Sequence, residues 1–357
     1  MSAVRKIRVL IVDDSAIVRK ILTEALGAEP DMEVVGAAPD PYVARDMILS
    51  RDPDVLTLDI EMPRMDGLTF LKKLMHFHPL PTVVISSLAQ PSCRAAIEAM
   101  ELGAVEVLAK PGGPYSVGDL RQSLANKIRA AASARVRRAQ PAAPPPAPAF
   151  TAAPEVVIAM GASTGGTEAI AFVLRQLPPS CPGMVIAQHI PPQFSRAFAN
   201  RLNDTCAMTV KEAEDGDPLP AGTALIAPGD FHMLLRKGAS GYYVSVKTGP
   251  RVCYQRPSVD VLFSSVAEAA GANTVGVLLT GMGADGARGL LKMHQAGART
   301  IAQDEASCVV FGMPREAIAL GAADRVLPLD RISTAMLASC APRPLRAPRP
   351  ERRAESG

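Results

Sequence analysis

Short apolar runs that end in polar or glycine residues recur along this chain, and a helical pattern follows most of them. Runs of this length are typical of strands that are buried on both faces. Strands that alternate with helices predict a parallel sheet covered by helices on both faces, with ligands at the carboxyl ends of the strands. In the first third of the chain, such runs occupy residues 8–12, 54–58, 82–85 and 105–109.

A glycine-rich turn follows one such run in the second half of the chain. Residues 156–170 read VVIAMGASTGGTEAI, which predicts a strand, a turn that contains Ser163, and a helix from about Thr167. The spacing of residues 161–165 fits the G-x-S-x-G pattern of a nucleophile elbow, and the free N–H groups of the helix start lie beside the serine. The alternative is a turn that binds phosphate or simply reverses the chain.

Length and composition exclude several classes of protein. The 357 residues suggest about two domains. The net charge of +3 gives no general case for nucleic-acid binding, and no apolar run approaches the roughly 18 residues of a membrane span. The N-terminus turns acidic where a signal peptide would continue apolar, so we expect a cytoplasmic protein. The six cysteines lack metal-ligand spacing and are expected to be reduced packing residues.

Polar side chains gather at the predicted strand ends of the first domain. Asp13 and Asp14, Asp59, Ser86 and Lys110 each follow a different apolar run. Three carboxylates would repel one another without a divalent cation, and an open site of oxygen ligands suits Mg²⁺. A carboxylate held by Mg²⁺ and a lysine can accept a phosphoryl group. A single aspartate at a strand end is usually a helix cap, but four strand ends together favour a phosphorylation site.

These residues lie in the motifs LTLDIEMPRMDGL, VVISS and AKP, and residues 7 to about 128 resemble a response-regulator receiver domain. The resemblance implies that Asp59 is phosphorylated by a histidine kinase, with Mg²⁺ bound by the three aspartates. It also implies that the Ser86 hydroxyl acts as a switch and that Lys110 contacts the phosphoryl group. The usual aromatic switch residue, three positions before the lysine, is Val107 here, so aromatic switching is not expected.

A proline- and alanine-rich segment separates the two halves. Residues 141–150 read PAAPPPAPAF, which predicts an extended, semi-rigid spacer. The basic residues before it are expected to form a solvated helix face, with a docking role as the less favoured alternative. They are Lys127, Arg129, Arg135, Arg137 and Arg138. The expected organisation is a receiver at 1–128, a linker at 129–153, a catalytic domain at 154–340 and a disordered basic tail at 341–357.

Three residue types needed for acyl transfer follow buried runs of the second domain. Ser163, His189 and Asp285 should therefore lie at one sheet edge, and the glycine-rich loop 281–286 can bring N–H groups to an oxyanion. The order serine, histidine, aspartate differs from that of α/β-hydrolases. The segments TALIAPG, HMLLRK and YYVSVK (within 223–247) are expected to be antiparallel. The competing residues are His232 near a turn, Asp304 after a strand, His294 within a helix, and His76 and His78 at a helix end.

The motifs GASTGGTEA, AQHIPPQFSRAFANRLN, APGDFHM, RPSVDVLF, LTGMGADGA and AQDEASCVVFGMP resemble the catalytic domain of chemotaxis protein-glutamate methylesterases. The resemblance implies that Ser163 is the nucleophile, His189 the general base and Asp285 the residue that orients it. Backbone N–H groups near Thr164 and Met282 would be the oxyanion donors. The implied fold is α/β, with two doubly wound parallel-sheet domains: a flavodoxin-like receiver and a Rossmann-like domain with an antiparallel hairpin.

The implied function is a phosphorylation-activated serine esterase that hydrolyses glutamate γ-methyl esters on chemoreceptors and deamidates receptor glutamines. Its partners would be methyl-accepting chemoreceptors and a histidine kinase, with no nucleic acid, no membrane insertion and no cofactor for hydrolysis. We further expect the unphosphorylated receiver to cover the edge that carries Ser163 and Asp285. The alternative is a response regulator with a non-catalytic binding module; alternating strands and helices argue against a helix-turn-helix domain.

Overall fold

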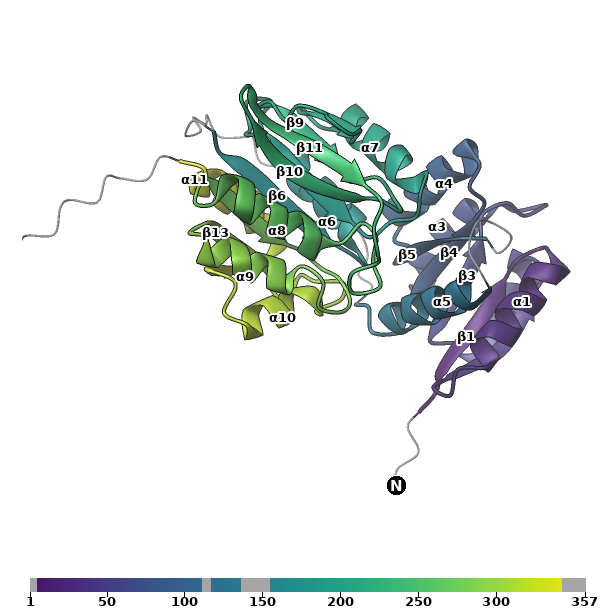
Figure 1. Ribbon diagram of the computed structural model, residues 1–357. Coiled ribbons are helices and arrows are strands. Elements are labelled where there is room, and N and C mark those ends of the chain that lie inside the picture. The colour runs from purple at the N-terminus through teal and green to yellow at the C-terminus, as the bar shows by residue number, and fades with distance from the viewer. Residues whose placement is uncertain (1–4, 111–116, 136–154, 342–357) are drawn as a thin grey trace, which may run out of the picture.

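The computed structural model describes residues 5–110, 117–135 and 155–341, which form two α/β halves, each built on a parallel sheet (Figure 1). Most of the expected linker and nearly all of the expected tail lie outside these residues. Within the described residues, no helix is long and apolar enough to cross a bilayer.

The first half is a five-stranded parallel sheet with the order β2-β1-β3-β4-β5. This strand order is that of flavodoxin-like folds and confirms the expected architecture. The elements are β1 (Ile7–Val12), α1 (Ala16–Gly27), β2 (Met32–Ala38), α2 (Pro41–Arg51), β3 (Val55–Asp59), α3 (Gly67–Phe77), β4 (Thr82–Ser86), α4 (Gln90–Glu101), β5 (Glu106–Ala109) and α5 (Val117–Ala132).

The second half is a seven-stranded parallel sheet with the order β14-β13-β12-β6-β7-β9-β8, and β10 and β11 form a separate antiparallel hairpin. The sheet elements are β6 (Val157–Ala162), β7 (Met184–Gln188), β8 (Thr209–Glu212), β9 (Thr223–Ile226), β12 (Thr274–Leu278), β13 (Arg299–Gln303) and β14 (Arg325–Leu327). The hairpin and helices are β10 (His232–Gly238), β11 (Gly241–Lys247), α6 (Gly166–Leu174), α7 (Phe194–Thr205), α8 (Val259–Ala270), α9 (Ala287–Gln295), α10 (Met313–Ala319) and α11 (Leu329–Ser339).

Three strands differ from the sequence expectations. The antiparallel assignment of residues 223–226 is wrong, because β9 pairs in parallel with both β7 and β8. Sequence reasoning missed β2 and β8. Both lie at sheet edges and carry several partly exposed residues, so they lack the continuous apolar run that marks the central strands.

Two helices of the first half contact the second half. Helix α4 packs against α7, as Figure 1 shows on the upper side of the junction. The Glu101 carboxylate, at the end of α4, accepts hydrogen bonds from Arg175 (3.2 Å) and from Arg201 (2.9 and 2.8 Å). Beyond α5, the Arg135 guanidinium lies 3.0 Å from Glu305. Charged pairs at the end of α4 and just beyond the end of α5 therefore hold the two halves together.

The basic residues of α5 do not form the expected solvated face. Arg129 is bonded to Asp31 at 2.8 Å and to Glu29 at 2.7 Å, and Lys127 pairs with Glu106. The helix also continues to Ala132, past the domain boundary expected at residue 128. The sequence does not show which acidic residues of other elements lie beside the cations of this helix. The expectation of a solvated face is therefore wrong for Lys127 and Arg129. Arg137 and Arg138 lie outside the described residues.

Candidate active site and phosphoacceptor site

Ser163 lies in the tight turn between β6 and α6. Gly165 has a φ of +75°, and a Cβ atom there would lie 2.6 Å from the Val309 side chain. A Cβ at Gly166 would lie 2.1 Å from the side-chain oxygen of Gln188. The Ser163 N–H donates to the Thr280 carbonyl at 3.0 Å. Both glycines are therefore required by close packing, which holds the serine at the carboxyl edge of the sheet.

His189 follows β7 directly and is 7% exposed. Its Nε2 atom lies 2.8 Å from Oδ2 of Asp285, while its Nδ1 atom has no hydrogen-bond partner among the described residues. The carboxylate can only accept, so Nε2 carries the proton and Nδ1 is left with a free lone pair. His189, Asp285 and Ser163 all line one cavity of about 440 Å³. The structure thus brings together three residues that are far apart in sequence.

Four donors surround the carboxylate of Asp285. Its Oδ1 atom accepts from the Ser258 hydroxyl (2.8 Å) and the Asp260 N–H (3.0 Å). Its Oδ2 atom accepts from the Val259 N–H (2.7 Å) and from His189. Burial raises the pKa of Asp285, but the hydrogen bond and charge of His189, with the Asp260 and Ser258 donors, hold that pKa below its usual value. The carboxylate therefore stays charged at the start of α8.

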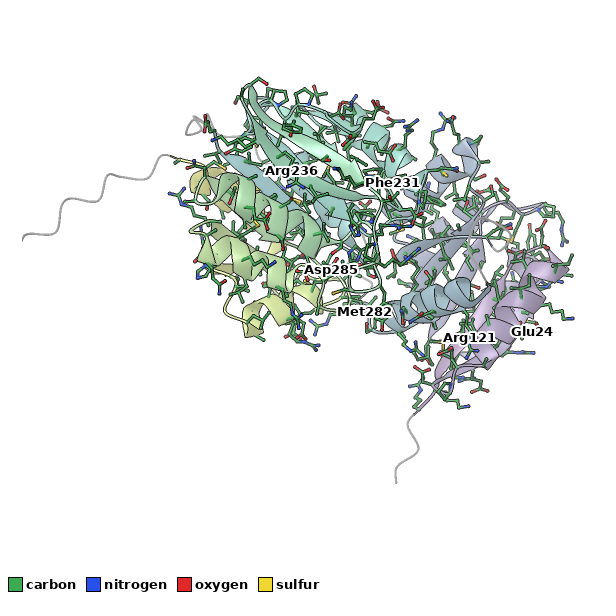
Figure 2. All side chains as sticks on the ribbon, in the orientation of Figure 1. Glu24, Arg121, Phe231, Arg236, Met282 and Asp285 are labelled. Carbon is green, nitrogen blue, oxygen red and sulfur yellow. The ribbon has the colours of Figure 1, made fainter. Side chains whose placement is uncertain are left out.

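The two expected oxyanion donors lie on loops that are fastened to each other. The N–H groups of Thr164 and Met282 donate to no acceptor within the part of the chain that the structure describes. The Thr280 hydroxyl lies 3.0 Å from the Thr164 carbonyl oxygen, which ties the serine turn to the 281–286 loop. Figure 2 shows Met282 and Asp285 together at the edge of the second half that faces α5.

The competing residues have other contacts. Both ring nitrogens of His232 are occupied, by the Pro250 carbonyl (2.9 Å) and by the Ser258 N–H (3.2 Å). Asp304 accepts hydrogen bonds from Ser307 within its own loop. These contacts favour structural roles for both residues. Sequence reasoning missed Ser258, although a serine before a helical pattern is a typical N-cap, which it is here.

The first half of the chain and the 249–257 loop complete the wall of the cavity that contains Ser163. On the side of the first half, the cavity is lined by the α5 residues Gln122, Ser123, Asn126 and Lys127. From the loop come Arg251, Cys253, Tyr254 and Gln255. All six cysteines are free, but Cys253 is exposed at this cavity, so its expected role as a packing residue is wrong.

The residues predicted to take part in phosphorylation converge at the carboxyl edge of the five-stranded sheet. Lys110 Nζ lies 2.7 Å from Oδ2 of Asp59 and 3.8 Å from Oδ2 of Asp13. Burial, followed by the neighbouring charge of Asp59, raises the pKa of Asp13 to about 6, and burial also raises the pKa of Asp59. The Ser86 hydroxyl lies 3.3 Å from the Ser92 carbonyl of α4. It is thus engaged with α4.

The acidic residues of this site fit a divalent cation. Oxygen atoms of Asp13, Asp14 and Asp59 all lie within 4.8 Å of one another. The Asp13 Oδ2 atom is buried and has no hydrogen-bond partner among the described residues. Carboxylate oxygens on an open edge are the ligands that Mg²⁺ prefers.

We expect Mg²⁺ binding at this site to weaken as the pH falls through about 6, because Asp13 must lose its proton to become a ligand. Below that pH, affinity should fall up to about tenfold per unit. Because the pKa of Asp13 is higher in the folded protein than in the unfolded chain, Asp13 also contributes to the stability of the fold at low pH. This contribution to stability is fully present below the pKa of the unfolded chain and is lost as the pH rises through about 6. Titration calorimetry at several pH values, with Asp13→Asn as the control, measures the effect. Equal affinity at pH 5 and pH 7.5 would contradict it.

Comparison with known proteins bears on both halves. The family model described as CheB methylesterase matches residues 158–336, and that of the response regulator receiver domain matches residues 9–123. The protein-glutamate methylesterase/protein-glutamine glutaminase 2 of Syntrophus aciditrophicus is 58% identical over 334 residues, which cover 92% of this chain and 97% of the relative. A Yersinia pestis protein-glutamate methylesterase/protein-glutamine glutaminase is 55% identical over 339 residues, with 93% and 97% covered.

A solved structure resembles the second half. The Thermotoga maritima CheB methylesterase catalytic domain is 38% identical and covers 52% of this chain and 99% of its own, with a TM-score of 0.51.

Proposed function

Because this chain belongs to the CheB methylesterase family, we propose that Ser163 is its nucleophile, His189 its general base and Asp285 the residue that orients the base. The chain is a protein-glutamate methylesterase and protein-glutamine glutaminase with a receiver domain. The observation that carries the residue assignment is the Asp285–His189 hydrogen bond, which leaves Nδ1 of His189 without a hydrogen-bond partner among the described residues; His189 and Ser163 line the same cavity.

Hydrolysis starts when the Ser163 hydroxyl attacks the ester carbonyl and gives its proton to Nδ1 of His189. Asp285 stabilises the imidazolium through Nε2. The N–H groups of Thr164 and Met282 donate to the oxyanion of the tetrahedral intermediate. His189 then returns the proton to the leaving methanol. A water molecule, deprotonated by His189, cleaves the acyl-enzyme to a glutamate carboxylate and regenerates Ser163.

The substrates that we propose are γ-methyl glutamate residues on cytoplasmic segments of chemoreceptors. Deamidation of a glutamine would follow the same steps, with ammonia as the leaving group. Methanol release from methylated receptor, compared with ammonia release from a receptor that carries glutamine, measures the two activities on one protein sample. If phosphorylated full-length protein released neither methanol nor ammonia from any of several receptors, this substrate class would be contradicted.

The receiver half implies phosphorylation and a chemotaxis kinase as partner. We assign Asp59 as the phosphoacceptor, with Lys110 as the positive contact and Ser86 as the switch hydroxyl. Asp13, Asp14 and Asp59 would hold Mg²⁺, which neutralises charge during phosphoryl transfer. For the domains, we propose a receiver at 1–128 continued by the rest of α5, a linker up to 153, a catalytic domain at 154–340 and a tail at 341–357.

Phosphorylation should be confined to Asp59. With Mg²⁺ and a phosphodonor, intact-mass measurement should find one acid-labile phosphoryl group, which Asp59→Ala should abolish because no other carboxylate lies 2.7 Å from Lys110 among the described residues. Asp54→Ala, which removes a carboxylate paired with Arg5 at the surface, is the matched control and should label normally. Undiminished phosphorylation of Asp59→Ala would contradict the assignment of Asp59 as the phosphoacceptor.

We also propose that the unphosphorylated receiver restricts access to Ser163. The α5 residues Ser123 and Lys127 border the cavity that contains Ser163 and His189, and Glu101 anchors α4 to α6 and α7. A bulky receptor helix needs the space that α5 occupies, whereas a small ester does not. Phosphorylation at Asp59 would draw the Ser86 hydroxyl away from the Ser92 carbonyl and so shift α4.

Removal of the receiver should therefore raise the rate on methylated receptor, by about tenfold, and change the rate on a small methyl ester less than twofold. Three forms of the protein are compared: full-length, phosphorylated full-length and residues 155–341. If residues 155–341 were no faster on receptor than the unphosphorylated protein, restricted access would be the wrong explanation. The receiver would then have to activate the catalytic domain directly.

A further inference from the structure

His232 is a buried histidine with both ring nitrogens engaged. It is 5% exposed at the start of β10. The Ser258 backbone N–H can only donate, so the Nδ1 atom of His232, 3.2 Å away, must be the acceptor. The ring proton therefore lies on Nε2, which donates to the Pro250 carbonyl at 2.9 Å. These two bonds fix a single neutral tautomer and join two segments that border the catalytic centre.

We propose that His232 is a positioning residue for ester hydrolysis, with a separate task for each ring nitrogen. Nδ1 holds Ser258 and thereby the donors around Asp285, whereas Nε2 holds the 249–257 loop, which lines the cavity that contains Ser163. The inference rests on the proposed function, because it assumes that Asp285 orients the catalytic base.

The Nδ1 contact reaches the catalytic carboxylate through one residue. Ser258 is the N-cap of α8, and its hydroxyl donates to Oδ1 of Asp285 at 2.8 Å. The N–H groups of the next two residues also donate to this carboxylate. Without an acceptor, the buried Ser258 N–H would be unsatisfied, and a shift of Ser258 to find another partner would displace this whole set of donors. The catalytic rate should then fall, because Asp285 would no longer hold His189 in place.

The Nε2 contact reaches the cavity wall instead. Cys253 and Tyr254 of the loop have φ values of 50° and 63°, a region that residues other than glycine seldom adopt. Such a backbone persists only where its surroundings hold it. Besides His232, Arg256 fastens the loop, through the Gly249 carbonyl (2.5 Å) and the Asp230 carboxylate (2.7 Å). Loss of the hydrogen bond to Pro250 alone should loosen the cavity wall and leave the carboxylate of Asp285 undisturbed.

Two substitutions separate the tasks, because each amide side chain reproduces one ring nitrogen. In His232→Asn the amide oxygen can replace Nδ1 as acceptor for Ser258, and in His232→Gln the amide nitrogen can replace Nε2 as donor to Pro250. On methylated receptor, His232→Asn should keep kcat within about twofold and raise KM about fivefold. His232→Gln should lower kcat about tenfold with KM nearly unchanged. His232→Ala should show both changes.

The controls distinguish this inference from the proposed function. His294→Asn and His294→Gln alter a partly exposed histidine of α9 and should leave both constants unchanged. Circular dichroism and thermal melting give the folded fraction by which each kcat is divided. If the Asn and Gln variants changed kcat and KM by equal factors, the inference would be overturned. It would also be overturned if kcat fell only in proportion to the folded fraction, and His232 would then have a structural role alone. Full activity of Ser163→Ala would instead overturn the proposed function.

Discussion

Replacement of Ser163 by alanine should lower kcat on methylated receptor on the order of 10⁵-fold, since it removes the hydroxyl that is proposed to form the acyl-enzyme. His189→Ala should cost nearly as much, because Nδ1 of His189 is the proposed proton acceptor. The double variant should be little slower than either single variant, because members of one catalytic unit are not additive. Steady-state methanol release, with folded protein confirmed by circular dichroism, measures all three.

The matched comparison is His232→Ala, since both histidines are buried and sequence reasoning left either as a candidate base. We expect this variant to lose only about tenfold in kcat, far less than His189→Ala, because neither nitrogen of His232 is free to accept a proton. An inactive His232→Ala beside a nearly normal His189→Ala would mean that the wrong histidine had been assigned.

Asp285→Asn should lower kcat on the order of 10³-fold, less than either change above. Asparagine offers one oxygen where the aspartate offers two, so its amide group must face two of the four donors that surround Asp285. If that group lies beside His189, the imidazole must accept at Nε2 and carry its proton on Nδ1. Nδ1 could then no longer take the proton of Ser163.

Asp304→Asn is the control for this substitution, because Asp304 also follows a strand but is bonded within its own loop. Its activity should stay within about twofold of the unaltered protein. A larger loss from Asp304→Asn than from Asp285→Asn would transfer the orienting role to Asp304.

Much of the fold could be predicted because the central strands of a parallel sheet are buried on both faces and read as continuous apolar runs. Strands β1, β3, β6 and β12 are of this kind, and the residues that follow such runs gather at one sheet edge. The edge strands β2 and β8 carry several partly exposed residues and lack this signal, which is why sequence reasoning missed them. The run TALI in β9 was read as antiparallel because it stands near the alternating hairpin strands, although its burial is that of a central strand.

The candidate site was predictable only in part, for a related reason. Ser163, His189 and Asp285 each follow a strand, so their approach could be expected from topology. The Ser258 and His232 contacts join a helix start to a hairpin strand, and no local pattern of residues encodes which loop folds against which. The pairing of Glu101 with Arg175 and Arg201 likewise joins separate halves of the chain. Each partner reads in the sequence as an ordinary surface charge.

Helix α4 has one consequence for the exchange of domains between relatives. Near its beginning the Ser92 carbonyl holds Ser86, and at its end Glu101 holds Arg175 and Arg201. If Ser86 acts as the proposed switch, the contact that would respond to phosphorylation and the contact that holds the catalytic half lie at the two ends of one helix. A chimera that joins a foreign receiver to this catalytic half would keep both chemistries. It would transmit no signal between them unless its fourth helix ended in an acid placed to meet these two arginines.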